Sequence, residues 1–173
     1  MNYFNQETQR LHLRKLTLED IPTWTEFFVD NDRLKFLGID VTKDSQTLAT
    51  EWIQSQLKRY ENQGLGFLAL IEKETNNFIG LAGILPREIN ETTEYEIAYS
   101  LKKEFWGKGF ATEVATHLKE FGLKNNIATR LVSIIDKENK DSINVAQKNK
   151  MNILYEIDNY LGMNVYVFGT VLT

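Results

Sequence analysis

The sequence predicts a single domain, residues 1–173, of the α/β class, with a mixed sheet and helices on both of its faces. Three observations predict this fold. Segments with alternating hydrophobic residues, as in strands, are interleaved with segments whose hydrophobic residues recur every three to four positions, as in helices. Two strands in the first half are joined by a short polar turn, which predicts an antiparallel hairpin. Later, a strand, a loop, a helix and another strand follow one another, which requires a crossover between parallel strands.

The first third of the chain contains one predicted strand and two predicted helices. The strand covers 9–16, where leucines alternate with polar residues. A helix is predicted over 17–30 because its hydrophobic residues have helical spacing, and a second helix is predicted over 43–63. Gly64 and Gly66 end the second helix.

The rest of the chain alternates between strands and helices. The hairpin and a third strand come first, a glycine-containing loop leads into a helix, and a strand, a helix and two final strands follow. Strands are predicted over 67–72, 78–85, 93–101, 130–135, 153–157 and 165–171, and helices over 110–124 and 141–148.

Residue types that are absent or rare limit the chemistry. The chain has no cysteine, which excludes disulfides, thiolate nucleophiles and cysteine-ligated metals, and its two histidines, His12 and His117, are too few for a three-histidine site. We therefore predict no metal site. The net charge of −4 suits a cationic partner better than nucleic acid. With no signal-peptide pattern and no membrane-length apolar run, we expect a cytoplasmic protein without nucleic-acid or membrane partners.

The segment 99–113 is the most informative about function. It joins a strand to a helix through a loop that contains Gly107 and Gly109. Glycine lets the backbone approach a ligand closely, and the amides at a helix start favour an anion. Lys102, Lys103 and Lys108 add positive charge, so the segment predicts a phosphate or pyrophosphate site. The alternative is a plain strand-to-helix loop with solvated lysines.

Two common phosphate-binding motifs are missing from this loop. A Walker loop would need Gly-x4-Gly-Lys-Ser/Thr, which the sequence lacks. A dinucleotide fingerprint would need a third glycine where Thr112 stands.

The run FWGKGFATE, residues 105–113, resembles the acetyl-CoA-binding loop of the GNAT superfamily of N-acetyltransferases. Gly109 and Ala111 match the last two defined positions of that loop. Trp106 stands where Gln or Arg is usual, a departure shared with the subgroup of ribosomal-protein N-terminal acetyltransferases. Residues 139–142, NKDS, resemble the Asn-x-x-Ser motif of that subgroup. The resemblance implies a mostly antiparallel sheet with a splayed parallel strand pair.

The resemblance also implies a co-substrate, acetyl-CoA, and residues that bind it. The pantetheine arm would lie between strands 94–101 and 130–135, and the pyrophosphate would lie on the amides of 107–112. The residues implied to bind acetyl-CoA are Ser100, Leu101, Lys102, Gly107, Lys108, Gly109, Phe110, Ala111, Thr112, Asn139 and Ser142.

Transfer of the acetyl group to an amine needs a base, because an amine attacks only when it is neutral. Glu96 matches the acidic residue on the family's strand before the loop and is the expected base, with Glu94 in reserve. A backbone N–H near Leu101 is the expected donor to the oxyanion. Both glutamates could instead be charged residues on a solvent-facing side of the strand.

The leaving thiolate also needs a proton donor, for which the sequence offers several candidates. Many GNAT enzymes use a tyrosine in the helix after the asparagine, but Ala146 occupies that position. The subgroup motif implies Ser142 as the substitute, although a serine there could simply cap the helix. Tyr155 and water are the other candidates.

The expected function is therefore N-acetyltransfer from acetyl-CoA to a primary amine, by direct attack in a ternary complex. The acceptor could be a protein N-terminus or a small molecule. One alternative is a degenerate acyl-CoA-binding domain with a regulatory or interaction role, and a weaker one is a nucleotide-binding domain. By analogy with the family, the chain could also form a homodimer.

Overall fold

One sheet of eight strands runs through the computed structural model, which describes residues 2–170. The strand order is β1-β2-β3-β4-β5-β6-β8-β7, and all neighbours are antiparallel except β5 and β6. The strands are β1 (Asn5–Glu7), β2 (Leu11–Arg14), β3 (Gly66–Glu72), β4 (Phe78–Ile89), β5 (Thr92–Leu101), β6 (Val132–Asp136), β7 (Asn152–Tyr160) and β8 (Met163–Gly169). The predicted mixed, mostly antiparallel sheet is confirmed.

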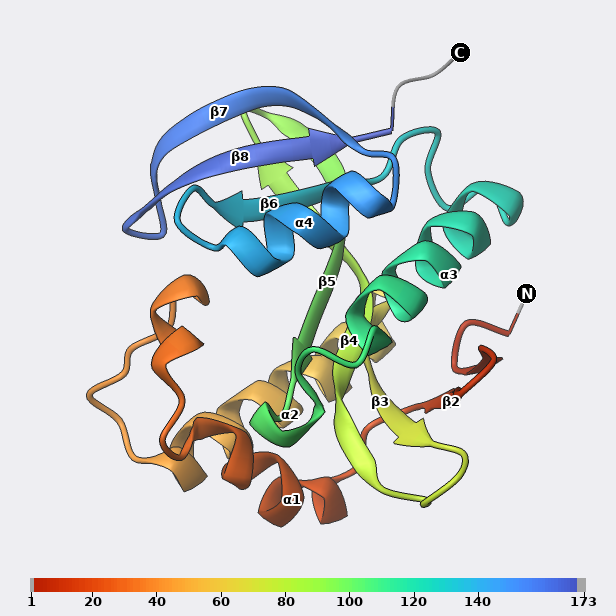
Figure 1. The fold of residues 1–173 in the computed structure, drawn as a ribbon, viewed down its shortest axis with the longest axis vertical. Coiled ribbons are helices and arrows are strands. Elements are labelled where there is room, and N and C mark those ends of the chain that lie inside the picture. The colour runs from red at the N-terminus through yellow and green to blue at the C-terminus, as the bar shows by residue number, and fades with distance from the viewer. Residues whose placement is uncertain (1, 171–173) are drawn as a thin grey trace.

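Helices cover both faces of this sheet. In Figure 1, α3 (Phe110–Lys124) and α4 (Lys140–Lys148) lie in front of it, whereas α2 (Ser45–Gln63) lies behind. The Asp44 carboxylate accepts from the Thr47 amide at 2.9 Å and caps α2, and Gly64 ends it in the left-handed conformation. None of the helices within residues 2–170 is long and apolar enough to cross a membrane.

The segment 17–30 differs from the single helix that we predict. It forms α1 (Ile21–Thr25) between two short 3₁₀ turns, Leu18–Asp20 and Glu26–Phe28. Its hydrophobic residues at 18, 21, 24 and 27 are three apart, which is the period of a 3₁₀ helix as well as an allowed spacing in an α-helix. The spacing therefore did not distinguish the two.

The sheet is nearly split between β5 and β6. A single residue pair, Glu96 with Val132, joins these two parallel strands, and beyond it they separate. This confirms the splayed pair. Figure 1 shows α3 following β5 and α4 following β6, so that both helices begin at the open end of the gap.

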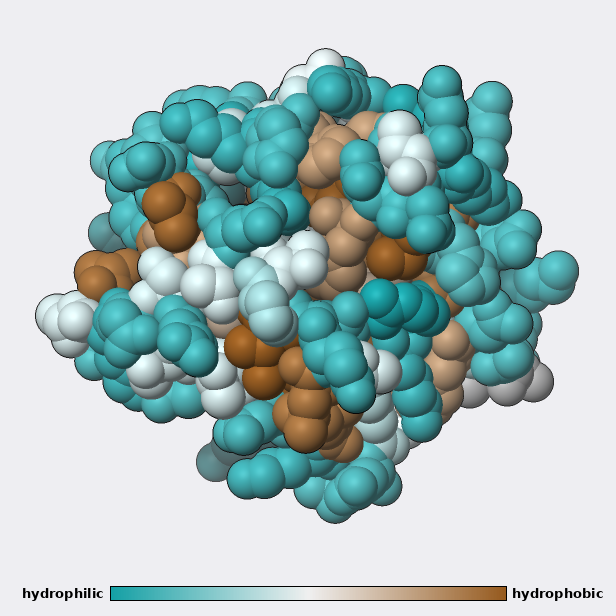
Figure 2. Space-filling view, turned by 90° about the horizontal axis from the view of Figure 1, so that it is seen from below, coloured by the Kyte–Doolittle hydropathy of each residue, from teal (hydrophilic) through white to brown (hydrophobic). Residues whose placement is uncertain are grey.

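Some large hydrophobic side chains remain exposed on the surface. Leu18, Val29, Val41 and Leu161 are each more than half exposed. On the face seen from below in Figure 2, hydrophobic side chains gather in the middle of a hydrophilic surround.

Candidate active site

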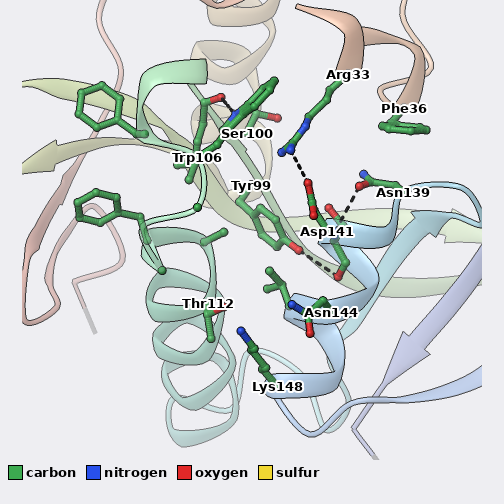
Figure 3. Close-up of a pocket in the computed structure, with 18 of the residues that line it drawn as sticks. Arg33, Phe36, Tyr99, Ser100, Trp106, Thr112, Asn139, Asp141, Asn144 and Lys148 are labelled. Atoms are coloured by element: carbon green, nitrogen blue, oxygen red, sulfur yellow. Dashed lines mark hydrogen bonds and ion pairs between the residues drawn. The ribbon is translucent and has the colours of Figure 1, made fainter.

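A cavity of about 460 Å³ lies between the β5–α3 loop and α4 (Figure 3), and we call it the large cavity. Its volume is in the range of sites for small molecules and cofactors. Its walls are the end of β5, the loop and first turn of α3, the first turns of α4, and residues from 27 to 37. Its lining residues outside the predicted set include Arg33, Phe36, Tyr99, Trp106, Asp141, Asn144 and Lys148.

The β5–α3 loop has the backbone shape that its glycines permit. Gly107 and Gly109 have φ of 70° and 83°, and Gly109 is the N-cap of α3. Because glycine has no side chain to cap the helix, the first-turn amides receive no side-chain hydrogen bond. The Trp106 indole N–H donates to the Leu101 carbonyl at 2.8 Å, which closes the loop onto the end of β5. This hydrogen bond gives the unusual tryptophan a structural role.

Arg10, which we do not predict, brings a guanidinium beside this loop, where it forms an ion pair with Glu113 at 2.7 Å. Arg10 donates to the Lys108 carbonyl at 3.0 Å, and its guanidinium lies 4.1 Å from the centre of the Phe110 ring. Lys102 instead forms ion pairs with Glu26 and, at 3.7 Å, Glu104. Of the three lysines predicted to add positive charge to the loop, Lys102 is therefore neutralised by carboxylates.

The first turn of α4 forms the opposite wall of the large cavity. The Asn139 side chain caps α4 by accepting from the Ser142 amide at 3.3 Å. The cap is therefore Asn139, and the interpretation of Ser142 as the capping residue is wrong. Arg33 forms an ion pair with Asp141 and lies 3.6 Å from the Trp106 ring centre, so it spans the mouth of the cavity (Figure 3).

A second cavity, of about 140 Å³, also borders β5 and is called the small cavity here. Glu96 lines it and is buried. One carboxylate oxygen of Glu96 accepts from Arg87 Nε at 2.7 Å, and the other has no hydrogen-bond partner within residues 2–170. The Glu96 charge raises the pKa of Arg87, although burial opposes this effect.

The two cavities meet at a small set of shared lining residues. These are Phe36, Leu37, Tyr99, Ser100, Asn139 and Ser142. The Tyr99 hydroxyl donates weakly to the Ser142 carbonyl, at 3.5 Å (Figure 3). Burial raises the pKa of Tyr99 to about 12, so its hydroxyl keeps its proton.

The other candidates for acid and base lie outside both cavities. Glu94 forms an ion pair with Arg130 and accepts from the Tyr155 hydroxyl at 3.4 Å. Neither Glu94 nor Tyr155 lines the large or the small cavity. Ala146, which occupies the position where many GNAT enzymes have a tyrosine, is buried, with 3% of its surface exposed.

All but two of the residues implied to bind acetyl-CoA line the large cavity. Lys102 and Lys108 are the exceptions. The Lys102 amide is used by the β4–β5 ladder, where it donates to the Ile79 carbonyl at 2.9 Å. Three residues beside the large cavity were not predicted from the sequence: Arg10, Arg33 and Tyr99. No local motif marks the two arginines, because the fold brings them to the site from distant segments.

The Acetyltransferase (GNAT) domain family matches residues 10–152 of the chain. The chain belongs to the GNAT acetyltransferase family. An uncharacterized N-acetyltransferase, p20, from Bacillus licheniformis is 31% identical to this GNAT chain over 169 residues, which cover 94% of this chain and 93% of p20.

Solved structures show that the fold is shared. An acetyltransferase from Agrobacterium tumefaciens has a TM-score of 0.79 at 23% identity and covers 97% of this GNAT chain and 94% of its own. The ribosomal L7/L12 α-N-protein acetyltransferase RimL, in complex with coenzyme A, has a TM-score of 0.76 at 17% identity. The match covers 95% of this GNAT chain and 96% of the RimL chain.

Proposed function

We propose that this protein is an N-acetyltransferase that transfers the acetyl group of acetyl-CoA directly to a primary amine. The observation that carries the proposal is the split of the sheet. After the Glu96–Val132 pair, β5 has no ladder partner on its β6 side among the described residues, 2–170. An unpaired strand edge offers N–H and C=O groups to an extended ligand, and the pantetheine arm has amides that can pair with it.

Acetyl-CoA would extend from this edge to the start of α3. Gly109 leaves the first-turn amides of α3 open to the pyrophosphate, and the helix dipole favours its negative charge. Arg10 adds a guanidinium beside the same turn. The RimL structure, which shares this fold, contains coenzyme A and so supports a coenzyme A thioester as the ligand.

The chemistry would take place where the two cavities meet. The amine enters through the small cavity and gives a proton to Glu96, directly or through water, before its nitrogen attacks the thioester carbonyl. A β5 backbone N–H near Leu101 stabilises the oxyanion. The tetrahedral intermediate then collapses, the C–S bond breaks, and the hydroxyl of Ser142 or Tyr99 gives its proton to the thiolate. The attacking nitrogen loses its second proton, which returns through water to that hydroxyl oxygen. The products are the acetylated amine and coenzyme A.

A coupled pair of measurements tests this function. Calorimetry with acetyl-CoA measures binding, and a free-thiol assay over a panel of amines measures turnover. We expect binding and acceptor-dependent thiol release. Binding without release for any amine would favour the degenerate acyl-CoA-binding domain, an alternative that rests on Ala146 in place of the tyrosine. Competition by ATP without a preference for coenzyme A would favour a nucleotide-binding domain.

A further inference from the structure

We infer that the small cavity selects a compact primary amine with a single positive charge, in preference to a polypeptide N-terminus or a polyamine. The inference rests on the proposed function, since it assigns the acceptor class of the same reaction. Three properties of the small cavity carry it: its aromatic walls, its charge and a close contact between two segments beside it.

Aromatic rings from five different elements or connecting segments line the small cavity. They belong to Phe36, Trp52, Phe67, Tyr99 and Tyr160. Ring faces attract a cation and also pack against a hydrocarbon chain, so they suit the ammonium and the alkyl or aryl body of one small amine. The cavity has about a third of the volume of the large cavity, which limits the size of that body.

The charges on the cavity wall match one ammonium group. Arg87, Glu96 and Asp136 are the charged residues that line it. Arg87 pairs with Glu96, whereas Asp136 has no ion-pair partner within residues 2–170. One negative charge therefore remains unmatched. An alkylamine has a pKa near 10.4 and enters as an ammonium ion, so a monoamine neutralises the cavity and a polyamine overcharges it.

Two distant segments pack closely against each other beside the small cavity. A Cβ atom at Gly38 would lie 2.8 Å from Leu161 Cβ and 3.3 Å from the end of Met163, so the backbone at Gly38 packs closely against the β7–β8 turn. Leu161 and Met163 also line the small cavity. This close packing leaves little room for a long acceptor at that part of the lining, whereas a compact amine needs less room.

A matched set of acceptors tests the inference. The compounds 2-phenylethylamine, phenylalanine, a peptide that begins with phenylalanine, and spermidine share an amine but differ in charge and size. We expect kcat/KM with acetyl-CoA to be at least tenfold higher for 2-phenylethylamine than for the other three. A preference for the peptide, phenylalanine or spermidine would overturn the inference and leave the N-acetyltransferase proposal intact.

Binding to the complex with coenzyme A separates the two proposals. Calorimetry with coenzyme A present measures the affinity for 2-phenylethylamine without turnover. Amine binding without catalysis would support the cavity assignment and count against the enzymatic function. Coenzyme A binding with no detectable monoamine binding would overturn the cavity assignment.

Two variants assign the preference to the cavity itself. We expect Asp136→Asn to raise the KM for 2-phenylethylamine several-fold, whereas Asp158→Asn, an exposed carboxylate outside both cavities, leaves it unchanged. We expect Leu161→Ala to raise the kcat/KM for the peptide relative to the monoamine at least threefold, whereas Ile153→Ala on β7 does not. The inference would be overturned if Asp136→Asn left the KM for 2-phenylethylamine unchanged and Leu161→Ala left the ratio of the two kcat/KM values unchanged.

Discussion

At the scale of single residues, Glu96 and Glu94 form a natural comparison. Both are buried carboxylates on β5 with an arginine partner, Arg87 or Arg130, but Glu96 lines the small cavity, whereas Glu94 lines neither the small nor the large one. Two positions along a strand share a face, so the sequence could name both as candidates but could not rank them by geometry. The fold separates them, because Arg130 and Tyr155 enclose Glu94 and not Glu96.

We predict that Glu96→Gln lowers kcat by roughly 10²- to 10⁴-fold, since an amide cannot take the proton from the amine. The acetyl-CoA dissociation constant should not change, because Glu96 lies in the small cavity. The measurements are steady-state kinetics and calorimetry. Glu94→Gln is the control: it also leaves an arginine without its carboxylate partner, yet it should keep kcat. Equal losses of kcat in the two variants would contradict the assignment of the base.

The proton donor can be decided between two hydroxyls at the junction of the cavities. We predict that Tyr99→Phe lowers kcat more than Ser142→Ala, because a phenol is a stronger acid than an alcohol and better matched to a thiolate. The pKa of Tyr99 is about 12, so activity should show no fall from its ionisation between pH 7 and pH 10. Tyr166→Phe, outside both cavities, is the control. A larger loss in Ser142→Ala would return the role to Ser142.

Sequence reasoning predicted the backbone part of the candidate site better than its side chains. Glycines in a strand–loop–helix unit indicate a local backbone shape, and most of the residues implied by that motif line the large cavity. Arg33 reaches the same cavity from a segment more than 60 residues away in the chain, and Tyr99 is one of several alternating residues of a strand. Neither position has a local signal, because only the packing of distant elements gives it a role.

At the scale of elements, the sequence predicted α2, α3 and α4 well because their hydrophobic stripes and caps are local. The helix α3 begins and ends at the predicted residues, Phe110 and Lys124. The segment 17–30 was harder, since Trp24, Phe27 and Phe28 form a buried aromatic cluster in which Trp24 stacks on Phe27 at 4.2 Å. The three-residue strand β1 is too short to show alternation. The predicted end of the last strand, residue 171, lies outside the described residues.

The helix α3 is tied to the N-terminal strands through Glu113. Its carboxylate accepts from Thr8 Oγ1 at 2.6 Å, from the Arg10 amide at 2.8 Å and from Arg10 Nε at 2.7 Å. Burial raises the pKa of Glu113, but these hydrogen bonds outweigh it and the net shift is downward. The contact fixes Arg10 beside the glycine loop, so it links the stability of the fold to the shape of the site.

We predict that Glu113→Gln lowers the free energy of unfolding by about 1–3 kcal/mol at pH 7. Because the pKa of Glu113 is lower in the folded chain than in the unfolded chain, its contribution is complete above the unfolded pKa, near 4.3, and is lost as the pH falls through the folded pKa. Urea unfolding at pH 7 and pH 3 measures this, and the difference from the wild type should shrink at pH 3. Glu120→Gln, exposed on the same helix, should change stability by less than about 0.5 kcal/mol. A difference that does not depend on pH would contradict the role of the carboxylate charge.

At the scale of the whole molecule, the sheet consists of two parts, β1–β5 and β6–β8, which a single β5–β6 residue pair joins. Contacts between α3 and α4, and the Arg33–Asp141 ion pair across the large cavity, add to that junction. A ligand that pairs with the free edge of β5 and also contacts Asn139 and Ser142 would bridge the two parts. Its binding should therefore be visible in the stability of the entire fold.

We predict that acetyl-CoA at about 100 times its dissociation constant stabilises the folded protein by about 2.7 kcal/mol, which raises Tm by roughly 5–10 °C for a chain of this length. The β5 amides beyond Glu96 that face β6 should also gain protection from hydrogen exchange, because within residues 2–170 they have no ladder partner on that side. The control is Gly109→Glu, which strains the left-handed N-cap of α3 and adds a negative charge where the pyrophosphate would lie. This variant should fold, with a somewhat lower Tm, and its Tm should not rise with acetyl-CoA.

A full rise of Tm with acetyl-CoA in Gly109→Glu would contradict the placement of the pyrophosphate. A rise in the wild type without new protection in β5 would instead place the pantetheine arm away from the split that divides the sheet.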